Sequence, residues 1–128
     1  MDVRILDVGQ CGFDHRAITS FLQSIVKAQV DAAGTAAEAS QLVRQNHYAL
    51  VLVNRLLDQD GSSGLELIKQ LRLNADCPRL MLVSNKPEAQ RQAIAAGALP
   101  GFGKNSLHKP QTAEHLRAVL EAKEGQEK

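Results

Sequence analysis

Residues that could carry chemistry follow the two most apolar stretches of the sequence. Asn54 ends the run ALVLVN (49–54), and Ser84 ends the run LMLVS (80–84). Such runs predict buried strands of a parallel sheet, and ligands and reactions collect at the carboxyl ends of these strands. An amide at position 54 either withholds a reaction that a carboxylate would perform there or supports a different one.

Three carboxylates near this position are further candidates. Asp58 and Asp60 lie in LDQDGSSG, whose DxDG resembles the start of an EF-hand calcium loop. That loop needs Gly at its sixth position and Glu at its twelfth, and counting from Asp58 gives Ser63 and Lys69. Asp, Gly and Ser are also the usual residues of a solvated turn, which we favour. Asp7 lies within a predicted strand, so we expect a structural hydrogen bond for its buried carboxylate.

The cysteines and histidines show no pattern of a metal or disulfide site. Cys11 and Cys77 lack zinc-ligand spacing, and we expect both to be reduced thiols. Cys11 precedes a predicted helix, where a thiol pKa can fall. CGFDHR resembles the Cys-x5-Arg loop of low-molecular-weight phosphatases, but only four residues separate Cys11 from Arg16. The histidines share no ligand spacing, and we expect surface or capping roles for His15, His47, His108 and His115.

Length and charge exclude several classes of protein. The chain has 128 residues, enough for one domain, and 15 basic against 14 acidic residues give a net charge of +1. The basic residues form no cluster, so we expect neither nucleic acid nor a membrane as a partner. No signal peptide or membrane-spanning run is present in the sequence. We therefore expect a cytoplasmic protein.

The apolar pattern predicts strands and helices in alternation. Strands are expected at 3–8, 28–33, 49–53, 78–84 and 98–102, the last at a sheet edge because it contains Pro and Gly. Helices are expected from an N-cap at Asp14, from capping boxes at 35–38 and 63–66, and at 87–97 and 112–123. This order requires crossover connections, which give a parallel sheet with helices on both faces.

With this order of elements, residues 2–122 resemble the CheY-like receiver domain of bacterial two-component response regulators. The resemblance implies a doubly wound, flavodoxin-like (βα)5 fold of the α/β class, with strand order 2-1-3-4-5. It covers a receiver-like domain at 1–123, with a frayed tail at 124–128. In the family, an Asp after strand three accepts a phosphoryl group. An acidic pair after strand one helps to hold Mg2+, and a Ser or Thr and a Lys bind the phosphoryl oxygens.

Carried over by position, the resemblance places Asn54 at the phosphoacceptor and Ser84 at the Ser/Thr position. Lys104 takes the Lys position by its spacing from Gly97, although Asn105 replaces the usual Pro and a KP pair recurs at 109–110. The aromatic residue usually found before this Lys is displaced by one place, to Phe102. We therefore expect a local alteration in this segment.

The departures from the family pattern concern its chemistry. The acidic pair falls on two of Gly9, Gln10 and Cys11, none of which is acidic. Mg2+ prefers carboxylate oxygen, so we expect its binding to be weak or absent, with no other cofactor. A carboxamide does not form an acyl phosphate, so Asn54 lacks the nucleophile. The loop from Asn54 to Gly64 is also about two residues longer than is usual in the family.

The sequence therefore favours a pseudo-receiver that is not an enzyme and binds proteins independently of phosphorylation. By resemblance, a histidine kinase, another regulator or a second copy would dock on the surface of helix four, strand five and helix five, about residues 87–123. The chain is expected to be either a stand-alone adaptor or a receiver cut from a longer protein. We expect Lys104 to bond Asn54 or a backbone carbonyl.

Two alternatives remain for the same sequence. One is an atypical receiver that is phosphorylated on Asp58 or Asp60. The other is a small flavodoxin-like domain that binds an anionic ligand over Asn54, Ser84 and Lys104.

Overall fold

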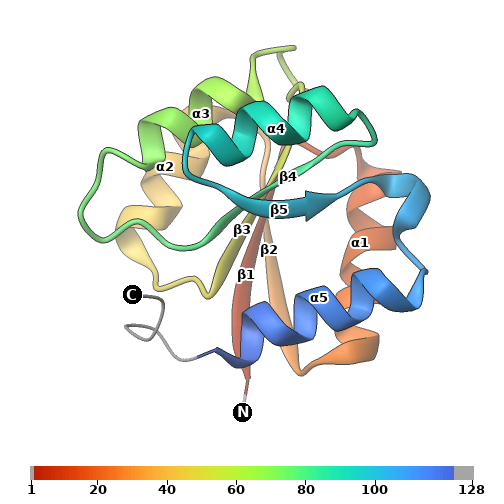
Figure 1. The fold of residues 1–128 in the computed structure, drawn as a ribbon. Coiled ribbons are helices and arrows are strands. Elements are labelled where there is room, and N and C mark those ends of the chain that lie inside the picture. Colours follow the sequence, from red (N-terminus) through yellow and green to blue (C-terminus); the bar gives the residue numbers. More distant parts are fainter. Residues whose placement is uncertain (1, 123–128) are drawn as a thin grey trace.

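A five-stranded parallel sheet forms the centre of the computed structural model, which describes residues 2–122 (Figure 1). The strands are β1 (Val3–Val8), β2 (Ala28–Ala33), β3 (Leu50–Asn54), β4 (Leu80–Val83) and β5 (Leu99–Phe102). The helices are α1 (Gly12–Ile25), α2 (Ala36–Gln45), α3 (Gly64–Leu71), α4 (Pro87–Ala95) and α5 (Pro110–Glu121), with a 3-10 turn, η1 (Lys104–Ser106), after β5. The strand order is β2-β1-β3-β4-β5, which confirms the predicted topology and places β5 at an edge.

Helices cover both faces of the sheet, as crossover connections between parallel strands require. In Figure 1, α1 and α5 lie on one face and α2, α3 and α4 on the other. Alternate residues of β3 enter the two cores: Val51 and Val53 pack with α3, whereas Leu50 and Leu52 pack with α1 and α5. This burial on both sides explains why the strand is continuously apolar.

Helix starts were predicted correctly where an oxygen side chain caps them. Thr35 and Ser63 each accept a hydrogen bond from the backbone N–H three residues later, at the starts of α2 and α3. The predicted N-cap at Asp14 is wrong. Cys11 caps α1 instead, and its Sγ accepts from Asp14 N at 3.4 Å. Asp14 lies in the first turn, where a negatively charged carboxylate interacts favourably with the helix dipole.

An extra residue in β5 interrupts its regular pairing with β4. Met81 pairs with Leu99 and Val83 with Phe102, so two steps along β4 match three along β5. The bulge turns Phe102 into the core, where it is 6% exposed. The displaced aromatic residue is therefore a core residue.

A side chain from α4 fills the gap that this bulge leaves between the strands. Gln90 Nε2 donates to Leu82 O at 2.9 Å and to Ser84 O at 3.1 Å. Its Oε1 accepts from Gly101 N at 3.1 Å. A Cβ at position 101 would lie 2.1 Å from Leu82 O, so only glycine fits opposite this join. Gln90 thus links α4, β4 and β5.

Two further sequence-based predictions concern membrane-spanning helices and the C-terminal tail. Within residues 2–122, no helix combines the length and apolar character needed to cross a membrane. The frayed tail predicted at 124–128 lies outside the described residues.

Candidate functional site

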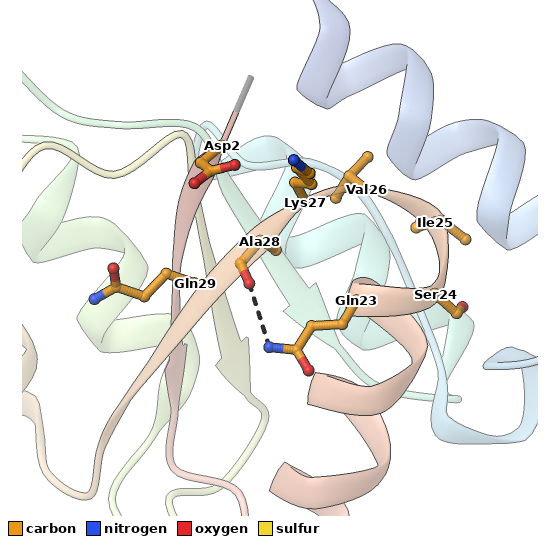
Figure 2. Close-up of a pocket in the computed structure, with 8 residues that line it drawn as sticks. All are labelled: Asp2, Gln23, Ser24, Ile25, Val26, Lys27, Ala28 and Gln29. Atoms are coloured by element: carbon orange, nitrogen blue, oxygen red, sulfur yellow. Dashed lines mark hydrogen bonds between the residues drawn. The ribbon is translucent and has the colours of Figure 1, made fainter.

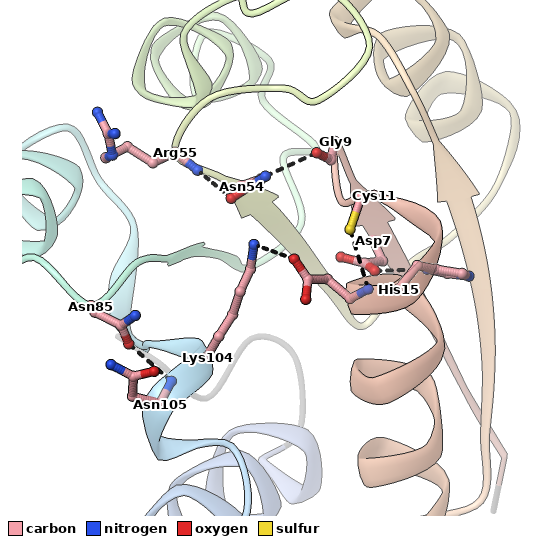
Figure 3. Close-up of polar contacts among 10 residues, drawn as sticks. Asp7, Gly9, Cys11, His15, Asn54, Arg55, Asn85, Lys104 and Asn105 are labelled. Carbon is pink, nitrogen blue, oxygen red and sulfur yellow. Dashed lines mark hydrogen bonds and ion pairs between the residues drawn. The ribbon is translucent and has the colours of Figure 1, made fainter.

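The candidate site lies at the carboxyl edge of the sheet, where β1 and β3 end and η1 follows β5 (Figure 3). Asn54 stands at the end of β3, next to Gly9 after β1, and Lys104 reaches toward them from η1. The fold thus brings together Gly9, Asn54 and Lys104, which the resemblance to receiver domains singled out.

Both polar atoms of the Asn54 side chain are used by the backbone around it. Its Nδ2 donates to Gly9 O at 2.9 Å, and its Oδ1 accepts from Arg55 N at 3.0 Å. The first bond needs a donor, which an ionised carboxylate does not have. The amide is therefore matched to a site in which it joins the ends of β1 and β3.

The long loop after β3 closes over Gly9. Gly9 has φ +81°, and a Cβ there would lie 2.3 Å from Leu57 Cδ2. Leu57 is fully buried, and the next residue, Asp58, donates its backbone N–H to Gly9 O at 2.9 Å. Gly9 O thus accepts from this loop as well as from Asn54. The loop occupies the space that a side chain at position 9 would need.

Lys104 forms an ion pair with Asp14 of α1, with Nζ 2.8 Å from Oδ2 (Figure 3). The hydrogen bond from Lys104 lowers the pKa of Asp14. The prediction that Lys104 bonds Asn54 or a backbone carbonyl is therefore wrong. Both polar atoms of Asn54 are already engaged, and the carboxylate of Asp14 offers a full opposite charge. The KP pair at 109–110 instead begins α5.

A buried carboxylate–imidazole pair lies behind this ion pair. Asp7 is 1% exposed, and its Oδ2 lies 2.7 Å from His15 Nδ1. Burial raises the pKa of Asp7 to about 6, although the contact with His15 acts in the opposite direction. Asp7 therefore has the hydrogen-bond partner that its predicted burial requires. The surface or capping role expected for His15 is wrong, because its ring binds a core carboxylate.

The residues present do not fit a Mg2+ ion. Mg2+ prefers carboxylate oxygens and keeps several waters. Of the nearby carboxylates, Asp14 is paired with Lys104, and Asp7 is buried against His15. Gln10 contributes only a neutral amide, which lies beside Asp7. Nor do residues 2–122 contain a cluster of three or more His, Cys, Asp or Glu side chains that could hold a metal.

The β4–α4 loop makes contacts that the sequence did not reveal. Ser84 Oγ accepts from Lys86 N at 3.1 Å, a bond within its own loop. Asn85 Oδ1 accepts from Asn105 N at 3.0 Å (Figure 3). Proline has no N–H, so this bond requires a residue other than proline at position 105. The loop is thereby joined to η1 next to Lys104.

The alternative carboxylates lie in a turn. Asp60 Oδ1 accepts from Ser62 N at 3.0 Å and from Ser62 Oγ at 2.7 Å, as expected for a solvated turn. Asp58 is exposed. Among residues 2–122, neither carboxylate belongs to a cluster of three or more His, Cys, Asp or Glu side chains that could hold a metal.

An open pocket lies at the other end of the strands. It has a volume of about 660 Å3 and is formed by the end of α1 and the start of β2 (Figure 2). Gln23 Nε2 donates to Ala28 O at 3.2 Å within it. None of the residues at positions 9–11, 54, 84 or 104 lines this pocket, so it is separate from the candidate site.

No protein-family model matches the chain, and no curated protein matches it in sequence. Solved structures match it in fold. A protein from Chloroflexus aurantiacus described as a response regulator has a TM-score of 0.81 at 19% identity, over 94% of this chain and 98% of that one. The signal receiver domain of a DNA-binding response regulator from Colwellia psychrerythraea has a TM-score of 0.77 at 18% identity, over 94% and 100%.

A third solved structure also matches this chain in fold. It is a response regulator from Burkholderia pseudomallei with a phosphorylated aspartic acid, a calcium ion and citrate. Its TM-score is 0.71 at 22% identity, over 94% of this chain and 68% of that one. Together these structures show that the chain has the CheY-like receiver fold.

Proposed function

We propose that this chain is a receiver-like domain of the two-component type that binds proteins without being phosphorylated. The observation that carries the proposal is the bond from Asn54 Nδ2 to Gly9 O. A carboxamide forms no acyl phosphate, and here the amide has a structural use that a carboxylate could not replace. We further propose that the domain is not an enzyme and that it works in the cytoplasm.

The contacts around the site support a fixed output surface. In receiver domains, phosphorylation shifts the Ser/Thr and aromatic positions. In this chain Phe102 is buried, Gln90 joins α4 to both β4 and β5, and Lys104 is held by Asp14. We propose that the α4/β5/α5 surface binds a histidine kinase, another regulator or a second copy in one constant conformation.

The phosphorylation half of the proposal is tested by intact-mass spectrometry after incubation with acetyl phosphate and Mg2+. A receiver domain with a complete acidic site serves as the positive control, and Asn54→Asp is run in parallel. The wild-type chain is expected to remain unmodified. A phosphoryl group on the wild type would overturn the proposal, and mapping it to Asp58 or Asp60 would establish the atypical receiver instead.

The partner half is tested by site-specific photo-crosslinking in cells. Ile94 of α4 is 43% exposed, and Leu73 after α3 is 85% exposed, so a photo-reactive residue at either position reaches solvent. Crosslinks from position 94 to a histidine kinase, a regulator or a second copy, absent from position 73, would support the surface. Equal crosslinking from both positions would contradict it.

A further inference from the structure

A groove outside the candidate site lies between α3, α4 and the loop after β3. Its volume is about 360 Å3. Its apolar lining comes from Leu56, Leu65, Leu82 and Ala89, and its cations are Arg55 and Lys86. The groove is open to solvent and includes residues of the loop that is longer than in the family.

An ordered backbone holds Leu56 outward beside this groove. Leu56 is 46% exposed, whereas the next residue, Leu57, is fully buried. Leu56 forms an antiparallel bridge with Ser63, and Gly64 N donates to Arg55 O at 2.8 Å across the same loop. The exposure of Leu56 is thus a property of a hydrogen-bonded loop. A large apolar side chain held open beside an apolar groove is typical of interaction sites.

The two cations that line the groove, Arg55 and Lys86, form no ion pair within residues 2–122. Within residues 2–122, the side chains of Arg55 and Lys86 make no hydrogen bond or ion pair, although Arg55 is half-buried. Figure 3 shows the Arg55 side chain leading away from Asn54 and Lys104. Glu88 is the one carboxylate among the groove's described lining residues, so two cations face one anion. Partly buried charges are usually paired, and this excess favours an acidic occupant.

We propose that this groove binds a segment of a partner protein that carries a large apolar side chain next to a carboxylate. The apolar side chain packs on Leu56 and Leu65, and the carboxylate binds Arg55 and Lys86. A polypeptide fits better than a small molecule, because small-molecule sites enclose most of their ligand and this groove is open. The inference rests on the proposed function as a protein-binding module and adds a surface between α3 and α4, which adjoins the α4/β5/α5 surface.

The test is a selection of random linear peptides displayed on phage against the full chain, followed by calorimetry with synthetic copies. Enriched peptides are expected to carry Asp or Glu within two positions of Leu, Ile, Phe or Trp. Their Kd should rise at least about tenfold in Leu56→Ser, which removes the apolar contact, and in Arg55→Gln, which removes the charged contact. Leu73→Ser is the control, because Leu73 is also an exposed leucine but lies outside the groove, whereas Ile94→Ser reports separately on the proposed α4/β5/α5 surface. Circular dichroism verifies that each variant is folded.

Each other outcome overturns the groove as a site for an acidic segment. Such outcomes are no enrichment, enrichment of peptides without an acidic residue, or peptides whose Kd is unchanged in Leu56→Ser and Arg55→Gln. A dimer in sedimentation that Leu56→Ser dissociates would identify a second copy as the occupant instead. Peptides that lose affinity only in Ile94→Ser would overturn the groove and leave the proposed function intact. A phosphoryl group in the mass experiment would overturn the proposed function without affecting peptide binding.

Discussion

The side chain of Leu57 occupies the space that a side chain at Gly9 would fill. A Cβ at position 9 would lie 2.3 Å from Leu57 Cδ2 and 3.0 Å from Leu57 Cα. The loop after β3 therefore excludes an acidic side chain at position 9 while the loop keeps this conformation. The loop conformation and the glycine at position 9 thus depend on each other.

Gly9→Ala should destabilise the protein more than Gly61→Ala. Both glycines have positive φ, +81° and +72°, so both substitutions carry the left-handed backbone cost of about 1–2 kcal/mol. Only Gly9 also meets Leu57, because a Cβ at Gly61 has no atom within 4 Å. We expect a loss of about 3 kcal/mol or more in the free energy of unfolding for Gly9→Ala and about 1 kcal/mol for Gly61→Ala. Urea denaturation measures both, and equal losses would contradict the contact.

Asn54→Asp should destabilise the protein at neutral pH and less so in acid. An ionised carboxylate cannot donate to Gly9 O and places a negative charge beside that carbonyl, at a cost of about 1–3 kcal/mol. A protonated carboxyl regains a donor, so the loss relative to wild type should shrink near pH 4. Asn54→Ala, which cannot titrate, is the control. Urea denaturation at neutral pH and near pH 4 measures the loss in the free energy of unfolding relative to wild type. This loss should differ between the two pH values for Asn54→Asp and stay constant for Asn54→Ala.

Asp7→Asn should remove a pH dependence of stability. Burial raises the pKa of Asp7 from 3.8 to about 6, so between these values the folded protein binds the proton more tightly than the unfolded chain. The contribution of Asp7 to the free energy of unfolding therefore falls as the pH rises through this window, by on the order of 3 kcal/mol.

The difference between Asp7→Asn and wild type isolates this contribution. We expect the variant to be more stable than wild type at pH 8, with the advantage shrinking as the pH falls toward about 4. Urea denaturation across this range is the measurement. An advantage that stays constant with pH, or that grows in acid, would refute the role assigned to Asp7.

Gln90→Ala should loosen the join between β4 and β5. The substitution removes bonds to Leu82 O, Ser84 O and Gly101 N, and leaves these backbone groups without their partner. We expect a loss of about 2–3 kcal/mol in the free energy of unfolding and faster hydrogen exchange at the Gly101 amide. Gln92→Ala on the same helix is the control, because Gln92 is exposed and should change stability by less than about 0.5 kcal/mol. Similar effects of the two substitutions would show that Gln90 makes no special contribution.

Local signals predicted the fold because they repeat along the chain. Apolar runs and oxygen caps such as Thr35 and Ser63 located the elements, and the resemblance to receiver domains supplied the strand order that the structure confirms. The start of α1 was misplaced because a cysteine is a rare cap, and Asp14 three residues later is a common one. The start of α5 was placed at 112, two residues after its actual start at Pro110.

The sequence indicated which residues lie near one another at the candidate site, but not which atoms they contact. The resemblance placed Gly9, Asn54 and Lys104 near one another, and the fold brings their segments to one edge of the sheet. The pairing of Lys104 with Asp14 joins residues 90 positions apart, and no sequence period reports such a pair. Burial of Leu57 in a polar loop was missed for the same reason, although an isolated Leu pair within that loop was the available signal.

The link that Gln90 makes has a consequence for the speed of recognition. A partner of the proposed α4/β5/α5 surface would meet α4, β4 and β5 as one hydrogen-bonded unit, so we expect that surface to be in its binding conformation before the encounter. Association should then follow a single exponential whose rate rises linearly with partner concentration, because no slow rearrangement of this domain precedes or follows the encounter. Differences in affinity between partners should accordingly arise in their dissociation rates.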